Sequence, residues 1–517
     1  MMEENDCTGP NCEQTISMPL LDNMEATLKA DLDVRKLNKF LKRYISHEVK
    51  TEIADAMPDA MLKMMNESLL KVESLESRLD ELMTKKEIKE DMAPTTSSAP
   101  INEICLDTRE DCQNLNRDSN ICESNDDDRR DACRMTCGYC EPMGHTFYLG
   151  FSPNIRTAQL IFSSVRRGVC NLTTLGSSTY AHILLENASR IHSLSGVASK
   201  EYKLKCNILT KLYVIEIRSD GVDGYIVIPT KYLSRQYIIP SYNQGSGPGT
   251  YLAIISTNQA TEVEISQKGK SFTKASLNID MEWNNYNNDK IDISGSYVEA
   301  SKPVAVFSNI VCTSVGSCAP FSDMVIPMRY YSKTFFVPFF QGITLKSVRI
   351  YANSTCSINV YDASLNLLSA ASLDIIKRFV EVNNTNMASI VSSCPSMVQL
   401  YSHKASNQKD FMTLITGIDK YLPHYYFTMP SYSSLLLIII ETAKKSALII
   451  DGTTITPGRI TEIQEPVNSY NKYSMFTFTI SQGRHEAKTT NGASFGLWIY
   501  GTKDGFAFPA GYRISKT

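Results

Sequence analysis

The chain has 517 residues, of which 43% are hydrophobic and 21% are charged, and its net charge at pH 7 is −3. No extended Lys/Arg patch points to nucleic acid, and no apolar run approaches the roughly 18 residues that span a membrane. Because this length exceeds a single hydrophobic core, we expect two or more domains, with neither a nucleic-acid partner nor a membrane span.

Residues 1–23 are predicted to be a flexible N-terminus. Their opening, MMEENDCTGPNCEQ, has neither the basic nor the apolar region of a signal peptide. Cysteines further along the chain nevertheless predict export, so we expect a secreted protein whose signal peptide is not visible in this sequence. Cys7 and Cys12 either pair with each other or link two chains.

Residues 24–91 are predicted to form a helical, coiled-coil-like stem that Pro58 interrupts. Its second half carries an apolar stripe at near-heptad spacing, formed by Leu62, Met65, Leu69, Val72, Leu75, Leu79 and Leu82. We expect this stripe to join copies of the chain into a homo-oligomer; a helical hairpin folded on itself is the alternative. Residues 92–104, which are rich in Pro, Ser and Thr, read as a linker.

Residues 105–140 form a small module with too few apolar residues for a core. Its six cysteines are predicted to make three disulfides, and they are Cys105, Cys112, Cys122, Cys133, Cys137 and Cys140. Zinc is the competing interpretation because Cys137 and Cys140 form a CxxC, but no second CxxC completes four ligands. Disulfides persist outside the cytosol, so this module favours an extracellular protein.

The cysteine spacing resembles the ShK-toxin-like (ShKT) module, with a Cys-x-Asp opening and a CxxxCxxC close. The resemblance implies the pairings Cys105–Cys140, Cys112–Cys133 and Cys122–Cys137. Channel-blocking members carry a Lys-Tyr pair, where this chain has Asp127 and Asp128. A cation-selective pore would repel that pair, so we expect a stapled spacer or contact module.

Residues 145–517 alternate apolar and polar residues between frequent turns, which predicts an all-β region. Three segments recur in it, because residues 228–242 align without gaps to 326–340 and 418–432. This frame makes Tyr237, Phe335 and Phe427 equivalent, and a further, degenerate unit is expected to open at Phe147. Units of about 90 residues are longer than propeller blades, so we expect tandem β-sandwich-like units.

The same region resembles the N-terminal domain of IgGFc-binding proteins. The resemblance lies in residues 223–242, in SGSYVEASKPVAVFSNIVC (294–312) and in ISQGRHEAKTTNGASFGLWIYG (480–501). Ser234 and Asn309 replace usual glycines, and residues 318–328 lack the usual Cys-Asp-His. The resemblance implies an extracellular binding module associated with mucus or surfaces; binding of an antibody Fc is not implied.

Two further sets of residues carry covalent predictions. Three more disulfides are expected among Cys170 with Cys206, Cys312 with Cys318, and Cys356 with Cys394. Five Asn-x-Ser/Thr sequons predict glycosylation, at Asn66, Asn171, Asn187, Asn353 and Asn383.

Catalytic signals are weak. The sequence has no HExxH, nucleophile elbow, phosphate-binding loop or calcium loop, so we expect no metal, no cofactor and no enzymatic activity. His485 is the most tempting base, and a surface histidine is the expected alternative. The ligand-binding residues remain unknown at this stage.

These features predict a secreted, multivalent recognition or adhesion glycoprotein. Its ligand would be a glycan or glycoprotein of mucus, matrix or a microbial surface, with innate immunity as the expected context. The alternative is a structural matrix or mucus component without a specific ligand. An enzyme with an unrecognised site is the third hypothesis.

Overall fold

The computed structural model describes residues 142–514, apart from gaps at 154, 165, 178–179, 219–220, 243–248, 268–269, 288–291, 311–320, 344, 404–408, 456–459, 469 and 502. The predicted stem, linker and ShKT-like module therefore lie outside the described residues. So do Cys7, Cys12 and Asn66, the six module cysteines, and the pair Cys312 and Cys318.

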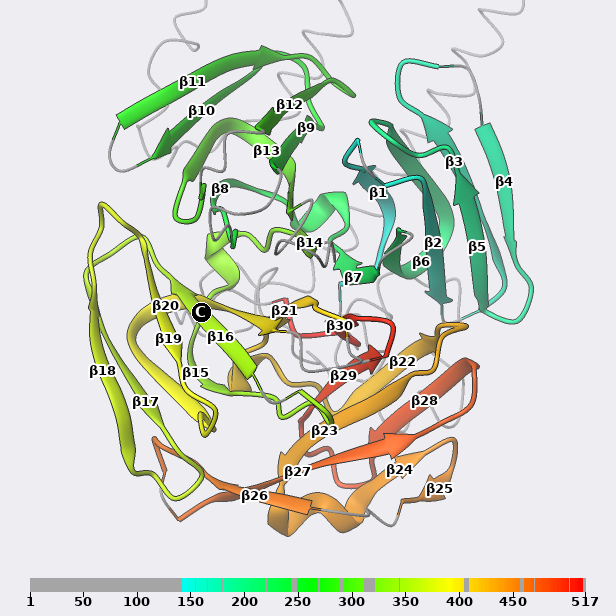
Figure 1. Ribbon diagram of the computed structural model, residues 1–517. Helices are drawn as coiled ribbons and strands as arrows, with labels where there is room; N and C mark the ends of the chain where they lie inside the picture. Colours follow the sequence, from blue (N-terminus) through cyan, green and yellow to red (C-terminus); the bar gives the residue numbers. More distant parts are fainter. Residues whose placement is uncertain are drawn as a thin grey trace, which may run out of the picture. The chain divides into compact units, whose positions relative to one another are not determined.

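The described residues confirm a mainly β protein. Their helical segments are short 3-10 turns, η4 (Thr230–Tyr232), η5 (Met328–Tyr330), η6 (Ile418–Lys420) and η7 (Thr442–Ala447). None of the helices in this part of the chain has the length and apolar character needed to cross a membrane. The strands fall into four consecutive units, which confirms the predicted repetition (Figure 1).

The first unit is one antiparallel sheet of seven strands. In chain order they are β1 (Gly144–Gly150), β2 (Thr157–Ser164), β3 (Gly168–Thr174), β4 (Tyr180–Leu185), β5 (Ser189–Ser195), β6 (Glu201–Ile217) and β7 (Val222–Val227). The order in the sheet is β4-β3-β6-β2-β5, and β1 and β7 also pair with β6. Strand β6 is long enough to take two neighbours on each side.

The second and third units repeat this order strand for strand. The second consists of β8 (Ser234–Ile238), β9 (Thr250–Ser256), β10 (Thr261–Gln267), β11 (Lys270–Leu277), β12 (Glu282–Asn287), β13 (Tyr297–Ile310) and β14 (Phe321–Met324). The third consists of β15 (Ser332–Phe336), β16 (Leu345–Tyr351), β17 (Cys356–Tyr361), β18 (Leu367–Leu373), β19 (Phe379–Asn383), β20 (Ser389–His403) and β21 (Met412–Ile415). Strands β13 and β20 take the place of β6.

The fourth unit departs from this plan because its long strand is split in two. Its strands are β22 (His424–Met429), β23 (Leu435–Glu441), β24 (Leu448–Ile450), β25 (Thr453–Thr454), β26 (Ile460–Gln464), β27 (Lys472–Thr479), β28 (Gly483–Thr489), β29 (Phe495–Gly501) and β30 (Phe506–Pro509). They form two sheets, β22-β28-β24-β25 and β26-β27-β23-β29-β30. Together, β28 and β29 occupy the place of β6.

The units are curled sheets, which corrects the expectation of sandwich-like units. In the third unit the edge strands β18 and β19 contact each other, so the sheet closes towards a barrel. One long strand belongs to both halves of the sheet, and two separate packed sheets therefore do not arise. The burial of β6 follows this division. Buried residues alternate with more exposed ones in the first half of the strand, and the second half is continuously buried.

One buried aromatic residue occupies the same place in all four units. Phe147, Tyr237, Phe335 and Tyr425 each lie on the first strand, opposite the first half of the long strand or, in the fourth unit, opposite β28. The expected start at Phe147 fits this register. The predicted alignment of residues 418–432 with the other repeats is wrong by two residues, because Tyr425 and not Phe427 is the equivalent of Tyr237.

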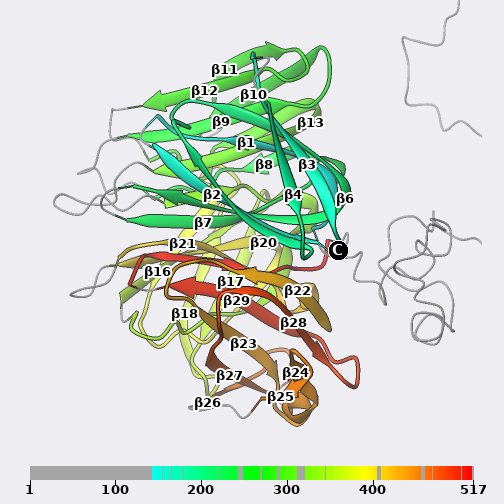
Figure 2. The ribbon, with the colours of Figure 1, turned by 90° about the vertical axis from the view of Figure 1, so that its right-hand side faces the viewer.

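The last strands of the four units meet one another at the centre of the molecule. Strand β7 contacts β14, β21 and β30, and β21 contacts β14 and β30 (Figures 1 and 2). One hydrophobic cluster draws residues from all four units, among them Phe162, Phe307, Leu414 and Phe508. The units therefore share a core and are not independent domains in a row.

Side-chain contacts connect each unit to the next. Lys203 pairs with Asp280 at 2.7 Å between the first and second units, and Trp498 donates to the carbonyl of Leu414 at 3.2 Å between the third and fourth. The hydroxyl of Tyr213 donates to the carbonyl of Ala510 at 2.6 Å, so the fourth unit also contacts the first. The four units thus close on one another.

Three acidic side chains are buried where the last strands meet. Asp223 on β7 accepts the backbone N–H groups of Ser322 on β14 and Met412 on β21, at 2.9 and 3.2 Å. Glu216 accepts the Ser322 hydroxyl at 2.7 Å, and Asp323 accepts the Gln399 amide at 2.8 Å. Burial raises the pKa of Glu216 to about 7 and that of Asp323 to about 7.

Candidate functional site

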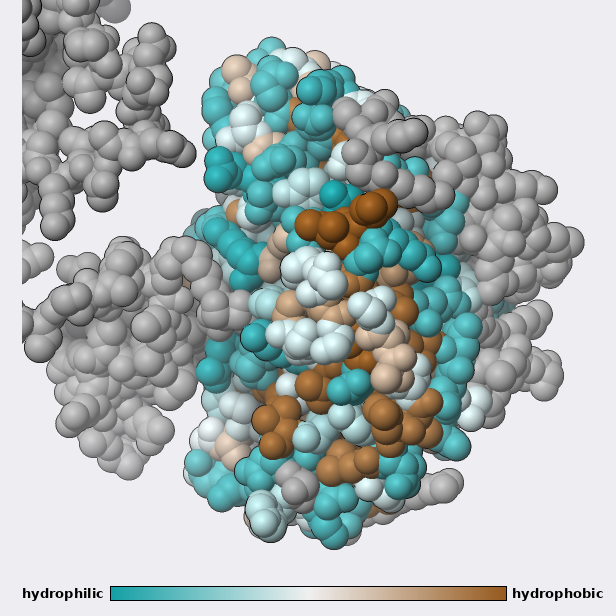
Figure 3. All heavy atoms as spheres, turned by 90° about the vertical axis from the view of Figure 1, so that its left-hand side faces the viewer, coloured by the Kyte–Doolittle hydropathy of each residue, from teal (hydrophilic) through white to brown (hydrophobic). Residues whose placement is uncertain are grey.

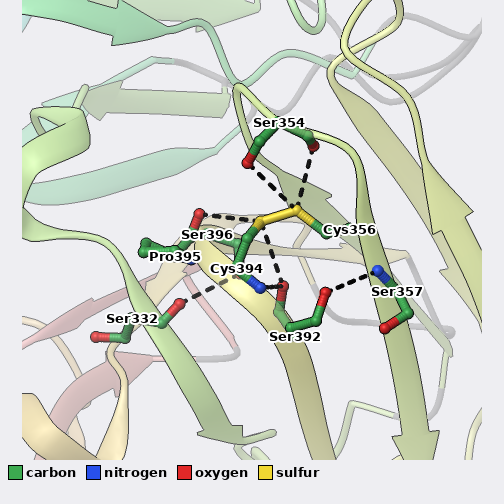
Figure 4. The surroundings of a disulfide bond; sticks show 9 residues. Ser332, Ser354, Cys356, Ser357, Ser392, Cys394, Pro395 and Ser396 are labelled. Atoms are coloured by element: carbon green, nitrogen blue, oxygen red, sulfur yellow. Dashed lines mark hydrogen bonds between the residues drawn. A yellow bond between two sulfur atoms is a disulfide. The ribbon is translucent and has the colours of Figure 1, made fainter.

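The described residues contain two disulfides, and both join cysteines that the sequence analysis pairs. Cys170 on β3 is bonded to Cys206 on β6, and Cys356 on β17 is bonded to Cys394 on β20. Both bridges therefore cross the same pair of strands in their units. Figure 4 shows the second bridge among the serines Ser354, Ser392 and Ser396. The two disulfides hold the long strand of each unit to the neighbouring strand.

Four of the five predicted glycosylation sites lie in the described residues. Asn171, Asn187 and Asn383 are exposed, and Asn353 is half-buried. The side chain of Asn353 accepts a hydrogen bond from Arg378 through its oxygen, at 3.0 Å. A glycan would be attached through the amide nitrogen, so this contact does not occupy the atom that is modified.

His485 is buried, so the surface position expected for it is wrong. Its Nδ1 lies 2.7 Å from the carboxylate of Asp451, and its Nε2 lies 2.8 Å from the carbonyl of Ser481. Both ring nitrogens therefore already contact groups of the protein itself, and neither one faces an open site. Among the described residues, no cluster of three His, Cys, Asp or Glu side chains is arranged to hold a metal ion.

A groove between the second and third units is the candidate binding site. Its volume is about 530 Å³, which lies in the range of ligand-binding clefts. The second unit contributes residues just before β13, and the third contributes the β18–β19 turn and the start of β19. The lining residues are Asp292, Ser294, Asp374, Ile376, Lys377 and Phe379.

Arg349 on β16 fixes the two walls of the groove relative to each other. Its guanidinium lies 2.7 Å from Asp292 of the second unit and 2.8 Å from Glu381 of the third. It also donates to the carbonyl of Ser241 and the hydroxyl of Ser294, at 2.7 and 2.6 Å. These charge-assisted hydrogen bonds form in a buried setting, where they are strongest.

Aromatic rings surround the same guanidinium. Arg349 lies 4.4 Å from the ring centre of Tyr242 and 4.9 Å from that of Phe379. Tyr242 stacks on Tyr401 with their ring centres 4.7 Å apart, so rings from both units enclose the cation. Phe379 also lines the groove, and its contact with the Arg349 guanidinium therefore fixes the orientation of its ring.

Backbone packing brings the two units into close approach at the groove. Gly295 has a φ of +76°, and a side-chain carbon there would lie only 2.1 Å from the carbonyl oxygen of Lys377. Glycine is required for both reasons. Arg378 lies next to this contact, with its guanidinium 5.1 Å from the ring centre of Tyr297.

Two large apolar side chains stand exposed at the rim. Ile375 and Ile376, in the turn between β18 and β19, are 51% and 59% exposed. The Asp374 carboxylate holds this turn, since it accepts the N–H groups of Ile376 and Lys377, both at 2.7 Å. Figure 3 views the side on which β10, β11, β17 and β18 lie, and apolar residues gather in patches there. A rigid turn that displays adjacent isoleucines is typical of a contact surface.

The sequence reasoning did not find these residues. Asp374 to Phe379 reads DIIKRF, an apolar pair inside a polar turn, and that local anomaly is the only signal for the rim. Nothing local links Arg349 to Asp292, which lies 57 residues away.

The fold and the groove define a class: a disulfide-bonded, all-β protein that is consistent with an extracellular role in binding or adhesion. A family model described as IgGFc binding protein matches residues 223–501, more than half of the chain. The chain therefore belongs to the IgGFc-binding protein family. The match begins at Asp223 on β7 and ends at Gly501 on β29, so it contains the second and third units and the groove between them.

Other comparisons add no argument. Among solved structures, a biofilm-associated protein BSP domain is 7% identical over 71% of this chain and 95% of its own, with a TM-score of 0.12. Dimeric latent PorU from Porphyromonas gingivalis is 10% identical over 52% of this chain and 30% of its own, with a TM-score of 0.10. None of the curated proteins matches the chain.

Proposed function

We propose that this chain is a secreted, multivalent recognition or adhesion glycoprotein that binds glycoproteins or glycans of mucus, matrix or microbial surfaces. The groove between the second and third units carries the proposal, because it pairs a rigid apolar rim with charged walls. Membership in the IgGFc-binding protein family and the two disulfides support an extracellular setting.

The groove suits a polypeptide segment of a glycoprotein. An apolar side chain of the partner packs on Ile376 and Phe379, where burial of apolar area supplies the driving force. The Asp374 carboxylate and the Lys377 ammonium stand on the same wall and satisfy polar groups of the partner. Because Arg349 already holds the walls in place, binding orders few side chains and loses little conformational entropy.

Multivalency comes from self-association through residues 24–91. Several heads on one stem raise the apparent affinity without any new contact, provided that their ligands are reachable together. Replacing Leu69 and Leu75 of the full chain with Asp places charges in the predicted apolar stripe. Light scattering should then report a monomer, and binding to a dense mucin layer should weaken while single-site affinity stays constant.

Saturable binding separates this function from its alternative, a structural component without a specific ligand. The full glycosylated chain is titrated over immobilised mucin, fibronectin and immunoglobulin Fc in a surface plasmon resonance assay. A recognition protein saturates on at least one of these surfaces and is displaced by soluble ligand. Linear, non-displaceable adsorption to all three would favour the structural alternative.

A further inference from the structure

The outward face of the first unit presents one of the predicted glycosylation sites in the middle of a strand. Asn171 lies on β3 and is exposed, and the sequon continues through Leu172 to Thr173. Leu172 is buried, and side chains alternate between the two faces of a strand, so Asn171 and Thr173 both face away from the core. The acceptor amide and the hydroxyl that the sequon requires therefore stand on the same open face.

Strand β4, which pairs with β3, carries an apolar strip on this face (Figure 1). The register places His182 directly opposite Asn171. Tyr180 and Leu184 lie two residues away on either side of His182, and their side chains are 63% and 51% exposed. Residues diagonally across two antiparallel strands are about 7–8 Å apart, so both apolar side chains flank Asn171. A group attached to Asn171 would gain stability by covering them, since burial removes apolar area from water.

Hydrogen bonding orients the Asn171 amide for modification. The Nδ1 of His182 donates to the Oδ1 of Asn171 at 2.6 Å, and the ring of Tyr180 packs edge-on against that of His182, with the ring centres 5.1 Å apart. This contact engages the amide oxygen, whereas an N-linked glycan is attached to the amide nitrogen. Asn383 differs, because its amide nitrogen itself donates to Glu381 at 3.1 Å.

A disulfide next to the sequon connects it to the compartment in which this modification takes place. Cys170, the residue before Asn171, is bonded to Cys206 on β6. Disulfides form in oxidising compartments such as the lumen of the endoplasmic reticulum. Proteins that follow this secretory route receive glycans at Asn-x-Ser/Thr sequons. The strand that holds Asn171 therefore carries two features that point to the same route.

We propose that Asn171 carries an N-linked glycan whose inner sugars cover the strip of Tyr180 and Leu184. In the modification, the amide nitrogen forms a bond to the anomeric carbon of the sugar and loses a proton. The bond from that carbon to the diphosphate of a lipid-linked oligosaccharide breaks. The C–H faces of the sugars then pack on the apolar side chains, while their hydroxyls stay in water. The inference rests on the secreted, glycosylated state that the proposed function includes, but on neither its ligand nor its groove.

The test uses the full chain secreted from a eukaryotic host. Enzymatic release of N-glycans in heavy-oxygen water, followed by mass spectrometry of peptides, reports whether Asn171 is occupied. Hydroxyl-radical oxidation then measures the exposure of the Tyr180 ring in wild type and in Asn171→Gln. We expect Asn171 to be occupied and Tyr180 to be oxidised several-fold faster in Asn171→Gln than in wild type. Tyr470, which is 96% exposed in the fourth unit, is the internal control and should be oxidised at the same rate in both proteins.

Matched variants keep the result interpretable if Asn171→Gln fails to fold. Thr173→Val removes the sequon and should expose Tyr180, whereas Thr173→Ser preserves the sequon and should keep Tyr180 protected. Asn383→Gln removes a sequon that lies opposite Ser347 on the third unit, and should also keep Tyr180 protected. An unmodified Asn171, or equal oxidation of Tyr180 with and without its sequon, would overturn the inference. These readouts do not involve mucin, fibronectin or Fc, so a failure here is distinguishable from a failure of the proposed function.

Discussion

Arg349 and Asp292 form a 2.7 Å ion pair that joins the third unit of the fold to the second. The pair lies directly beneath the groove that Asp292 also lines. This ion pair therefore holds the two units together and also sets the shape of the groove, because the geometry of the groove depends on the spacing of the two units.

Removing Arg349 should destabilise the protein strongly. Arg349→Leu leaves the carboxylates of Asp292 and Glu381 without their cation, and breaking a buried pair in this way costs about 3–5 kcal/mol. Chemical denaturation followed by tryptophan fluorescence measures the loss. Lys274→Ala, which breaks an exposed pair with Glu264, is the control and should cost about 0–1 kcal/mol. Equal losses in both variants would contradict the role given to Arg349.

The buried acids predict that stability falls as the pH rises. In the unfolded chain Glu216 loses its proton near pH 4.5, whereas in the fold burial raises its pKa to about 7. Folding therefore takes up a proton between these values, and the stabilising contribution present below pH 4.5 is lost as the pH rises through 7. Asp323, raised from 3.8 to about 7, acts in the same direction.

Glu216→Gln tests this pH dependence. Glutamine can still accept the Ser322 hydroxyl but does not ionise, so the variant should lose less stability than wild type between pH 4.5 and 7. The difference should be about 2–4 kcal/mol, because the pKa of Glu216 rises from 4.5 to about 7 on folding. Denaturation midpoints across this range give the slopes. Parallel pH profiles for the two proteins would show that Glu216 does not titrate as described.

The hydroxyl of Tyr237 stabilises the turn at the start of the first strand of the second unit. Tyr237 accepts the N–H of Ser234 at 2.8 Å and donates to the carbonyl of Val304 at 2.7 Å. Tyr237→Phe should cost about 1–3 kcal/mol because both backbone groups lose their partner in a buried site. The thermal midpoint of the full chain is the readout. A midpoint equal to that of wild type would mean that water replaces the hydroxyl.

The two disulfides should contribute separately to stability. Cys170→Ala combined with Cys206→Ala opens a loop with a sequence separation of 36 and should cost about 2–5 kcal/mol. Melting curves with and without reductant measure this cost. Reductant should lower the midpoint of the double variant less than that of wild type, because one of the two described bridges is already absent. An identical shift in both proteins would argue against the Cys170–Cys206 bridge.

Much of the fold follows from local pattern. Alternation of apolar and polar residues predicts the strands, and the recurring motifs predict repeated units that begin at Phe147. The frame error at Tyr425 has a physical cause: a shift of two residues keeps every side chain on the same face of a strand. Tyr425 and Phe427 are both buried aromatic residues, so the apolar pattern cannot distinguish them.

The closure of the four units on one another could not be predicted from local pattern. It depends on contacts between distant residues, such as Tyr213 with Ala510 and Arg349 with Asp292. In the sequence, the second half of β6 has the apolar pattern of any buried strand. This pattern does not identify the elements that cover the strand. The groove arises from this closure, and its lining residues therefore carried only a weak local signal.

The most direct test of the account is binding by a chain whose groove rim carries charge. Ile376→Asp places a carboxylate where an apolar partner side chain is expected to pack, and Leu184→Asp makes the same change at a 51% exposed position of the first unit. Affinity for the glycoprotein surface that wild type saturates is measured by surface plasmon resonance, with melting temperatures as a folding control. The account predicts at least tenfold weaker binding by Ile376→Asp and wild-type binding by Leu184→Asp. Equal affinity of both variants and wild type would contradict it.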